Sequence, residues 1–326
     1  MSRFGYVAIA GRPNTGKSTL LNTVAGQKLS IVSNVPQTTR HPVRFVINLG
    51  DSQIALVDLP GFAKPKTLVG KRLNEAVSGW VADSDACILL VDAAAGVGRG
   101  DLYLARTILT TQVPAVCAVN KVDVASKAEI ALALEKMREV SEECEASGGK
   151  AFVDFVPISA KTGSGIRTLL DTVASILPES DHLYSGEESL GLGDDNELHR
   201  RIAEIIREKL IRNAKEELPY SIAVIVEDIN VREAKKTGEV ETESDQTGTQ
   251  YGRSRELIEI SVKILVERES QKAIVIGSKG EALKKAGTEA RLELEALLGS
   301  RVFLDLRVVV EKNWQKNPKI LDKLGL

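Results

Sequence analysis

The sequence has 326 residues, of which 43% are hydrophobic and 27% are charged, and its formal net charge is −2. This length exceeds what one hydrophobic core usually spans and predicts two domains, while the composition excludes a disordered chain, a collagen-like fibre and a disulfide scaffold. The near-neutral net charge predicts that any surface for nucleic acid is local. No apolar run is long enough to span a membrane, and the three cysteines lack metal-ligand spacing.

Short apolar strands alternate with helical patterns along residues 1–178. Strands are predicted at 4–10, 43–49, 53–58, 86–92, 115–120 and 152–158, and helices at 18–25, 71–82, 102–110, 127–146 and 166–176. This alternation predicts parallel strands joined by helices, and the short link at 50–51 predicts a hairpin over 43–58. The expected fold class is α/β, with a mixed sheet that carries helices on both faces.

Residues 179–196 are rich in Ser, Gly and acidic residues and predict a linker. Residues 197–326 predict a second, α+β domain followed by a C-terminal tail. Its elements are a helix at 198–212, strands at 221–227 and 256–267, a short element at 274–276, a helix at 281–298 and a strand at 302–310. The polar stretch 232–255, acidic over 239–245, predicts a flexible hairpin loop.

Residues 11–18, with the sequence GRPNTGKS, match the phosphate-loop pattern GxxxxGK[ST] between a predicted strand and a predicted helix. The loop amides can bind anionic oxygens, Lys17 can reach the β- and γ-phosphates, and the Ser18 hydroxyl can ligate Mg²⁺. A glycine-rich turn without a ligand is the alternative, which this context disfavours. The predicted nucleotide contacts here are Gly11, Arg12, Pro13, Asn14, Thr15, Gly16, Lys17, Ser18 and Thr19.

Three further motifs each follow a predicted strand, so all of them should meet at one edge of the sheet. The first is Asp58, Leu59, Pro60 and Gly61, whose carboxylate can hold Mg²⁺ through water. The second is Asn120, Lys121 and Asp123, whose aspartate can accept two hydrogen bonds from guanine but none from adenine. The third is Ser159, Ala160 and Lys161, whose backbone amide can donate to guanine O6. Together they predict GTP and GDP as ligands.

With these motifs the chain resembles the translation-factor-related GTPases. The resemblance implies that residues 36–40 form switch I, that Thr39 closes on Mg²⁺ together with Ser18 and Asp58, and that residues 61–70 form switch II. A solvated threonine-rich loop is the alternative for 36–40. The activity implied is hydrolysis of GTP to GDP and phosphate.

Phe62 stands where Ras-like enzymes carry a glutamine that orients water, so slow intrinsic hydrolysis is expected. The chain therefore resembles the branch with a hydrophobic residue there, in which a phosphate-loop asparagine helps to hold K⁺. Asn14 stands at the matching position, and bracing of the loop is its alternative role. The catalytic residues implied are Lys17, Asn14 and Thr39.

In the second predicted domain, Gly277, Ser278, Lys279 and Gly280 form a GxxG sequence. KH domains clamp single-stranded RNA with such a loop, and the α-β-β-α-α-β order resembles the bacterial KH variant. The nearby Lys272, Lys284 and Lys285 are further candidates for RNA binding, with a solvated helix face as the alternative.

A GTPase domain followed by this KH domain resembles the Era family of bacterial ribosome-assembly GTPases, with matching stretches at 11–14, 37–41, 205–210 and 218–221. The resemblance implies a switch that binds near the 3′ end of small-subunit rRNA and acts in assembly of the 30S subunit. A monomer is expected, although the sequence leaves the oligomeric state open. Residues 232–255 depart from the family pattern. Because the chain starts without a targeting segment, a cytoplasmic protein is expected.

Two alternatives stay open from the sequence. One is a tRNA-modification-type GTPase, which shares the TTR sequence and the phosphate-loop asparagine, although the GxxG sequence argues against it. The other is a guanine-nucleotide-dependent scaffold that associates peripherally with the inner face of the cell membrane.

Overall fold

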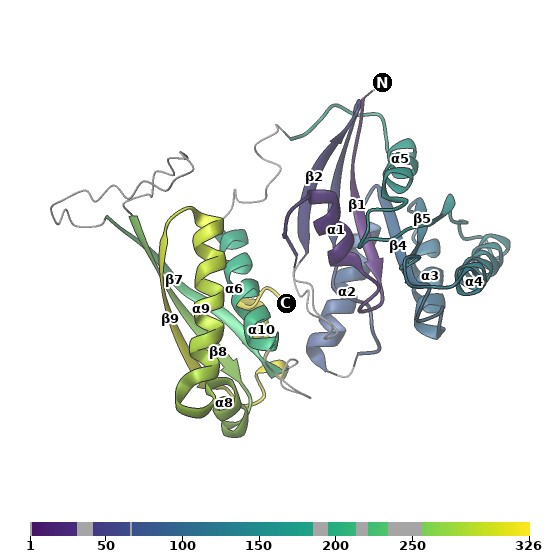
Figure 1. Ribbon diagram of the computed structural model, residues 1–326. Coiled ribbons are helices and arrows are strands. Elements are labelled where there is room, and N and C mark those ends of the chain that lie inside the picture. The colour runs from purple at the N-terminus through teal and green to yellow at the C-terminus, as the bar shows by residue number, and fades with distance from the viewer. Residues whose placement is uncertain (1, 31–41, 66, 185–194, 213–220, 234–255) are drawn as a thin grey trace. The chain divides into compact units, whose positions relative to one another are not determined.

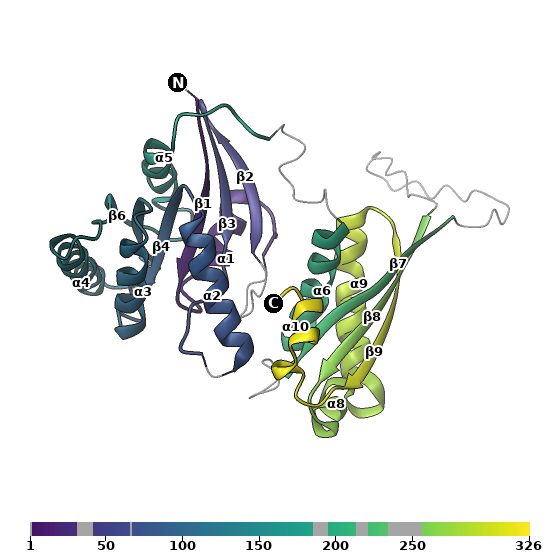
Figure 2. The ribbon, with the colours of Figure 1, turned by 180° about the vertical axis from the view of Figure 1, so that it is seen from behind.

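The computed structural model of the protein describes residues 2–30, 42–65, 67–184, 195–212, 221–233 and 256–326 (Figures 1 and 2). The chain forms two compact units, residues 1–197 with 325–326, and residues 198–324. The sequence-based domain limits at 178 and 197 stay predictions. None of the helices described is long and apolar enough to cross a membrane.

The first unit is an α/β layer built on six strands, as predicted. Its elements are β1 (Arg3–Gly11), α1 (Lys17–Ala25), β2 (Val43–Leu49), β3 (Ser52–Asp58), α2 (Leu68–Ala82), β4 (Ala86–Asp92), α3 (Arg99–Thr110), β5 (Ala115–Asn120), α4 (Lys127–Ala146), β6 (Asp154–Pro157) and α5 (Ile166–Ile176). The strand order is β2-β3-β1-β4-β5-β6, with β2 antiparallel to β3 and the other pairs parallel. The mixed sheet and the hairpin over 43–58 are therefore confirmed.

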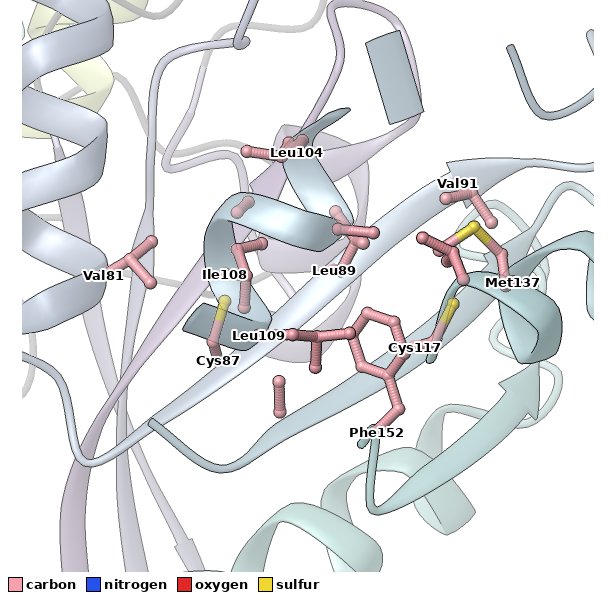
Figure 3. Close-up of a cluster of buried hydrophobic side chains, with 14 of the residues drawn as sticks. Val81, Cys87, Leu89, Val91, Leu104, Ile108, Leu109, Cys117, Met137 and Phe152 are labelled. Atoms are coloured by element: carbon pink, nitrogen blue, oxygen red, sulfur yellow. The ribbon is translucent and has the colours of Figure 1, made fainter. Parts of the chain in front are cut away.

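Both faces of this sheet are covered, which explains the continuous apolar runs of its central strands. Along β4, Cys87, Leu89 and Val91 point to one face and meet α2, α3 and α4, as Figure 3 shows. Ile88 and Leu90 point to the other face and meet α1 and α5. Alternation along the strands thus divides one run of apolar residues between two cores.

One predicted strand in this unit is too long. The expected strand at 152–158 is shortened to β6, because its pairing with β5 begins at Asp154 and ends at Pro157. The amide of Phe152 donates instead to the Ser141 hydroxyl of α4, at 2.9 Å. An apolar residue next to a strand can therefore be buried without belonging to it.

The second unit follows the predicted α-β-β-α-α-β order. It contains α6 (Asp195–Arg212), β7 (Ala223–Glu233), β8 (Glu256–Val266), α8 (Glu269–Ile276), α9 (Glu281–Leu298) and β9 (Arg301–Val310). The sheet order is β7-β8-β9, antiparallel and then parallel. Apolar side chains of α6, α8 and α9 form one core with the strands. The short element expected at 274–276 is the end of a full helix, α8.

The strand predicted at 221–227 begins later and extends further, to Glu233. Its second half contains charged residues, two of which pair with the next strand: Glu227 with Lys263 and Arg232 with Glu259. Because paired charges are tolerated on the exposed side of a strand, a polar sequence there does not indicate a loop. Residues 234–255 of the expected hairpin loop lie outside the described residues.

The C-terminal tail is folded onto the second unit. A 3₁₀ turn spans Trp314–Lys316 and a short helix, α10, spans Pro318–Lys323. Trp314 is fully buried and its indole N–H donates to the carbonyl oxygen of Ser221 at 3.0 Å. The sequence pattern predicted only a tail for this segment, without these two elements.

Candidate functional site

The phosphate loop connects the end of β1 with the start of α1. Asn14 and Gly16 have φ angles of 65° and 101°, in the left-handed region. A Cβ at Gly16 would lie 2.3 Å from Nδ2 of Asn120, so only glycine fits there. The Thr15 hydroxyl donates to the carbonyl oxygen of Arg12 at 3.0 Å. The backbone of the loop is therefore held in a fixed shape by its own residues and by β5.

Lys17 lies inside this loop. Its side chain is buried, and its ammonium donates to the carbonyl oxygens of Gly11 at 3.2 Å and Arg12 at 3.0 Å. Burial lowers the pKa of Lys17 to about 8, against the opposing effect of the nearby Asp58 carboxylate. The ammonium is thus placed where anionic phosphate oxygens would replace neutral carbonyl partners.

Asp58 ends β3 and is fully buried beside the loop. Its Oδ2 accepts hydrogen bonds from the hydroxyls of Ser18 and Ser30, both at 2.7 Å. Its Oδ1 is buried and has no hydrogen-bond partner in the described part of the chain. Burial raises the pKa of Asp58, although Lys17 and the two hydroxyls act in the opposite direction. A buried carboxylate oxygen left open beside a serine hydroxyl fits a hard cation such as Mg²⁺.

Asn120 links three loops at the base side of the site. Its Nδ2 donates to the carbonyl oxygen of Thr15 at 2.7 Å, and its Oδ1 accepts from the Ala160 amide at 2.8 Å. Ser159 is buried, and its hydroxyl donates to Oδ1 of the exposed Asp123 at 2.7 Å. The hydrogen bond from Ser159 therefore fixes one carboxylate oxygen of Asp123 and orients the carboxylate for a ligand.

The lysines of the two base-side motifs, Lys121 and Lys161, differ in their surroundings. Lys121 adopts a left-handed φ of 69°, and its Nζ lies 2.5 Å from Oδ2 of Asp92 at the end of β4. Lys161 is exposed and follows the Ser159–Ala160 turn. The ion pair with Asp92 fixes the side chain of Lys121 and so positions its aliphatic stem. Asp92 belongs to none of the sequence motifs.

The residues after Asp58 pack closely against the phosphate loop. A Cβ at Gly61 would lie 2.9 Å from the Cα of Pro13, and the Phe62 amide donates to the carbonyl oxygen of Gly11 at 3.0 Å. The Phe62 ring stacks on Tyr103 of α3 with a centroid distance of 5.7 Å. Gly61 therefore has to be small for this segment to reach the phosphate loop.

The structure brings the described residues predicted to bind nucleotide to one sheet edge, while Thr39 lies in 31–41, outside the described residues. Sequence reasoning missed Ser30, Asn22, Asp92 and Asp101. Asp101 accepts from the Arg12 guanidinium at 2.6 Å and from the Gly98 amide at 2.9 Å. Isolated residues of these types are common in any sequence, so most of the four could not be singled out. Only Asn22 could have been, because it lies four residues after Ser18 and therefore on the same face of the helix.

The GxxG sequence of the second unit forms a tight turn between α8 and α9. Gly277 and Gly280 have φ angles of 73° and 81°, and a Cβ at Gly277 would lie 2.6 Å from the Cβ of Ala282. Ser278 and Lys279 are exposed at the tip, and Lys279 itself has a left-handed φ of 49°. Lys284 and Lys285 are exposed on α9, and Lys272 is half-buried on α8. The turn therefore presents small residues, a helix N-terminus and lysines together.

Comparison with known proteins gives matches for both parts of the chain. Residues 6–121 match the family model described as a 50S ribosome-binding GTPase, and residues 239–315 match the KH domain. The chain is 38% identical over 325 residues to the GTPase Era of Mycobacterium avium, covering 99% of this chain and 98% of that protein. The chain belongs to the Era family of GTPases. It is therefore an enzyme that hydrolyses GTP.

Further Era proteins show the same relation. Era from Streptomyces coelicolor is 39% identical over 324 residues, which cover 99% of this chain and 95% of that protein. A crystal structure of Era with MgGDPNP and nucleotides 1506–1542 of 16S rRNA matches with a TM-score of 0.86 and 32% identity, covering 100% of this chain and 99% of the other. An Aquifex aeolicus Era variant bound to GDP and AlF₄⁻ matches with a TM-score of 0.84 and 32% identity, covering 99% of both chains.

Proposed function

We propose that this GTPase is a nucleotide-driven switch that binds small-subunit rRNA near its 3′ end and acts in assembly of the 30S subunit. The observation that carries the proposal is that one unit gathers the described guanine-nucleotide motifs at one sheet edge, while the other unit carries a lysine-flanked GxxG turn. The Era structure solved with MgGDPNP and a 16S rRNA fragment supports both ligands. The proposed function needs neither a membrane nor an oligomer, and we expect a cytoplasmic monomer.

For the metal, we propose that Ser18 and Asp58 hold Mg²⁺ and that Thr39 joins them. The oxygen donors and the open Oδ1 of Asp58 fit this ion, and the related Era complex was solved with MgGDPNP. When bound, Mg²⁺ would neutralise charge on the phosphate oxygens. Asn14 is exposed at the tip of the phosphate loop, which is compatible with a role toward K⁺.

The residues of the chain contribute mainly by position and charge. Lys17 binds β- and γ-phosphate oxygens, while Asn120 and Ser159 keep the base-binding loops in register with the phosphate loop. The Phe62 side chain cannot polarise a water molecule, and its backbone amide already donates a hydrogen bond to the carbonyl oxygen of Gly11. Because positioning and electrostatics supply most of the catalysis of phosphoryl transfer, hydrolysis without a partner should be slow.

For RNA, we propose that residues 277–280 clamp the phosphate backbone and that Lys272, Lys284 and Lys285 add positive charge. The left-handed glycines keep Cβ atoms away from the turn, which allows phosphates to approach its amides and the N-terminus of α9. Arg291, further along α9, pairs with Glu295 at 3.3 Å, so its charge is partly neutralised.

The base assignment is tested by changing Asp123→Asn. The amide of asparagine can donate a hydrogen bond to the 2-oxo group of xanthine. With guanine, the two hydrogen bonds that the Asp123 carboxylate accepts would be lost. We expect the variant to prefer xanthine nucleotides, with GTP affinity lowered by about ten-fold or more. Competition between GTP, XTP and ATP for a labelled nucleotide measures this. Wild-type protein that bound ATP as tightly as GTP would contradict the guanine assignment.

A further inference from the structure

Ser30 is a buried serine beside the proposed magnesium carboxylate that no sequence motif includes. It lies five residues after the end of α1, and its side chain is only 2% exposed. Its hydroxyl donates to Oδ2 of Asp58 at 2.7 Å. Burial of a hydroxyl whose described hydrogen bond is to a carboxylate suggests a role toward that carboxylate.

Asn22 fixes the backbone of Ser30 from the same helix that carries Ser18. Its Oδ1 accepts from the amides of Leu29 and Ser30, both at 2.8 Å, and its Nδ2 donates to the carbonyl oxygen of Ser30 at 2.9 Å. Two of these hydrogen bonds are to the backbone of Ser30 and the third is to the residue before it, which leaves this backbone little freedom. The Ser30 backbone is therefore held at a place from which its hydroxyl reaches Asp58.

Asp58 is thus attached to α1 in two ways. Ser18 donates to Oδ2 directly, and Asn22 acts on the same oxygen through Ser30. Both donors use Oδ2, while Oδ1 is left with no partner in the described part of the chain. Two donors on one oxygen prevent the carboxylate from rotating, and the other oxygen is kept open for a cation or its bound water.

We propose that Ser30 is a positioning residue for the magnesium carboxylate: held by Asn22, it fixes Asp58 with Oδ1 open to the metal. The inference rests on the proposed role of Asp58 toward Mg²⁺. Groups that hydrogen-bond to a metal-binding side chain typically change metal affinity by about ten-fold to a hundred-fold when removed. When the Ser18 hydroxyl binds the metal, it has to direct a lone pair toward it. Ser30 matters most in that state, because its hydrogen bond then keeps the Asp58 carboxylate in place.

The test measures release of fluorescently labelled GDP at increasing Mg²⁺ concentration, starting from excess EDTA. In Ser30→Ala the Mg²⁺ concentration needed for half of the full effect on GDP release should rise by about ten-fold. GDP release in EDTA should equal that of wild type, because Ser30 acts on the nucleotide only through the metal carboxylate. A loss of folding would instead change release in EDTA.

A second variant tests the route through Ser30. Asn22→Ala should raise the Mg²⁺ requirement in the same direction, and it should add nothing in the Ser30→Ala background if Asn22 acts through Ser30. Ser141→Ala is the matched control, since it removes a buried serine hydroxyl that hydrogen-bonds to the backbone amide of Phe152 elsewhere in the unit. This control should leave the Mg²⁺ requirement unchanged.

Two results would overturn the proposal, and they are distinguishable. If Ser30→Ala had the wild-type Mg²⁺ requirement or a lower one, Ser30 would not position the carboxylate for the metal. If Mg²⁺ did not slow GDP release in the wild-type protein, the magnesium role of Asp58 would itself be wrong. A higher Mg²⁺ requirement with unchanged release in EDTA supports the proposal.

Discussion

Lys17 carries its positive charge in a buried position, where the described partners of its ammonium are backbone carbonyl oxygens and its pKa is lowered to about 8. Phosphate oxygens at the same place would favour the charged form and raise this pKa again. Binding of nucleotide should therefore be coupled to uptake of a proton above pH 8. About one pH unit or more below 8 the free protein already carries this proton, and little coupling is expected there.

The first prediction is that GDP affinity falls as the pH rises above 8. In that range the free protein has lost the Lys17 proton and must regain it on binding, which costs up to about ten-fold in affinity per pH unit. Calorimetry in buffers of different ionisation enthalpy would show the proton uptake directly. Constant affinity between pH 7 and about pH 9.5 would contradict the prediction.

A second residue-scale prediction concerns Asn14. If this exposed amide helps to hold K⁺ against the phosphates, GTP hydrolysis should be faster in KCl than in NaCl at equal ionic strength. Asn14→Ala should remove the difference while keeping the affinity for GDP, because the loop shape also depends on Gly16, Thr15 and Asn120. Steady-state hydrolysis in the two salts measures this. Equal rates for the wild-type protein would leave bracing of the loop as the role of Asn14.

At the scale of elements, the chain after α5 is bound along the sheet. The fully buried Gln53 at the start of β3 accepts from the amides of Leu183 and Tyr184, both at 3.0 Å. Its Nε2 donates to the carbonyl oxygen of Tyr184 at 3.0 Å and to Oδ1 of Asn48 at 2.9 Å. Tyr6 and Tyr184 share a hydrogen bond between hydroxyls at 2.6 Å. The first residues of the expected linker are therefore attached to β1 and to the β2–β3 hairpin.

This attachment predicts an effect of Gln53→Ala. Removing the side chain leaves the amides of residues 183 and 184 without their protein acceptor, which should lower the free energy of unfolding by about 1–3 kcal/mol. Amide hydrogen exchange at these two residues should become faster. Asn48→Ala is the matched control, because it removes one partner of Gln53 and keeps its three hydrogen bonds to the segment. Unchanged exchange in Gln53→Ala would show that the segment is held by other contacts.

The elements that could be predicted from sequence are those with a strong apolar pattern. The strand over 86–92 and the helix over 127–146 were both predicted with their observed ends. In the structure both faces of the strand are buried, and Ser126 and Glu129 form a capping box at the start of the helix. Polar segments were not predictable in the same way. The attachment of residue 184 by Gln53, the extension of β7 and the contact of Ser30 with Asp58 depend on partners distant in sequence.

For the whole molecule, a net charge of −2 conceals a local arrangement. The lysines near the GxxG turn lie on α8, on the turn itself and on the first half of α9. An RNA backbone would meet these charges and the turn amides without any excess of positive charge over the full chain. Affinity for RNA should therefore depend on salt through a few phosphate interactions, and changes at the turn should weaken it.

The last prediction follows from this placement. Changing Ser278 and Lys279 together to Asp puts negative charge at the exposed tip of the turn, where phosphates would lie. RNA affinity should fall, and the slope of its logarithm against the logarithm of salt concentration should decrease by about 0.7 for each phosphate of a single strand that the turn no longer binds. The core of the unit should remain folded, because both side chains are exposed.

The matched control changes Ser147 and Lys150 to Asp, which adds the same charge on an exposed turn of the first unit. RNA affinity across a salt series and GDP affinity are measured on the same preparation. RNA binding that was unchanged, or lowered equally by the control, would exclude the turn as the clamp.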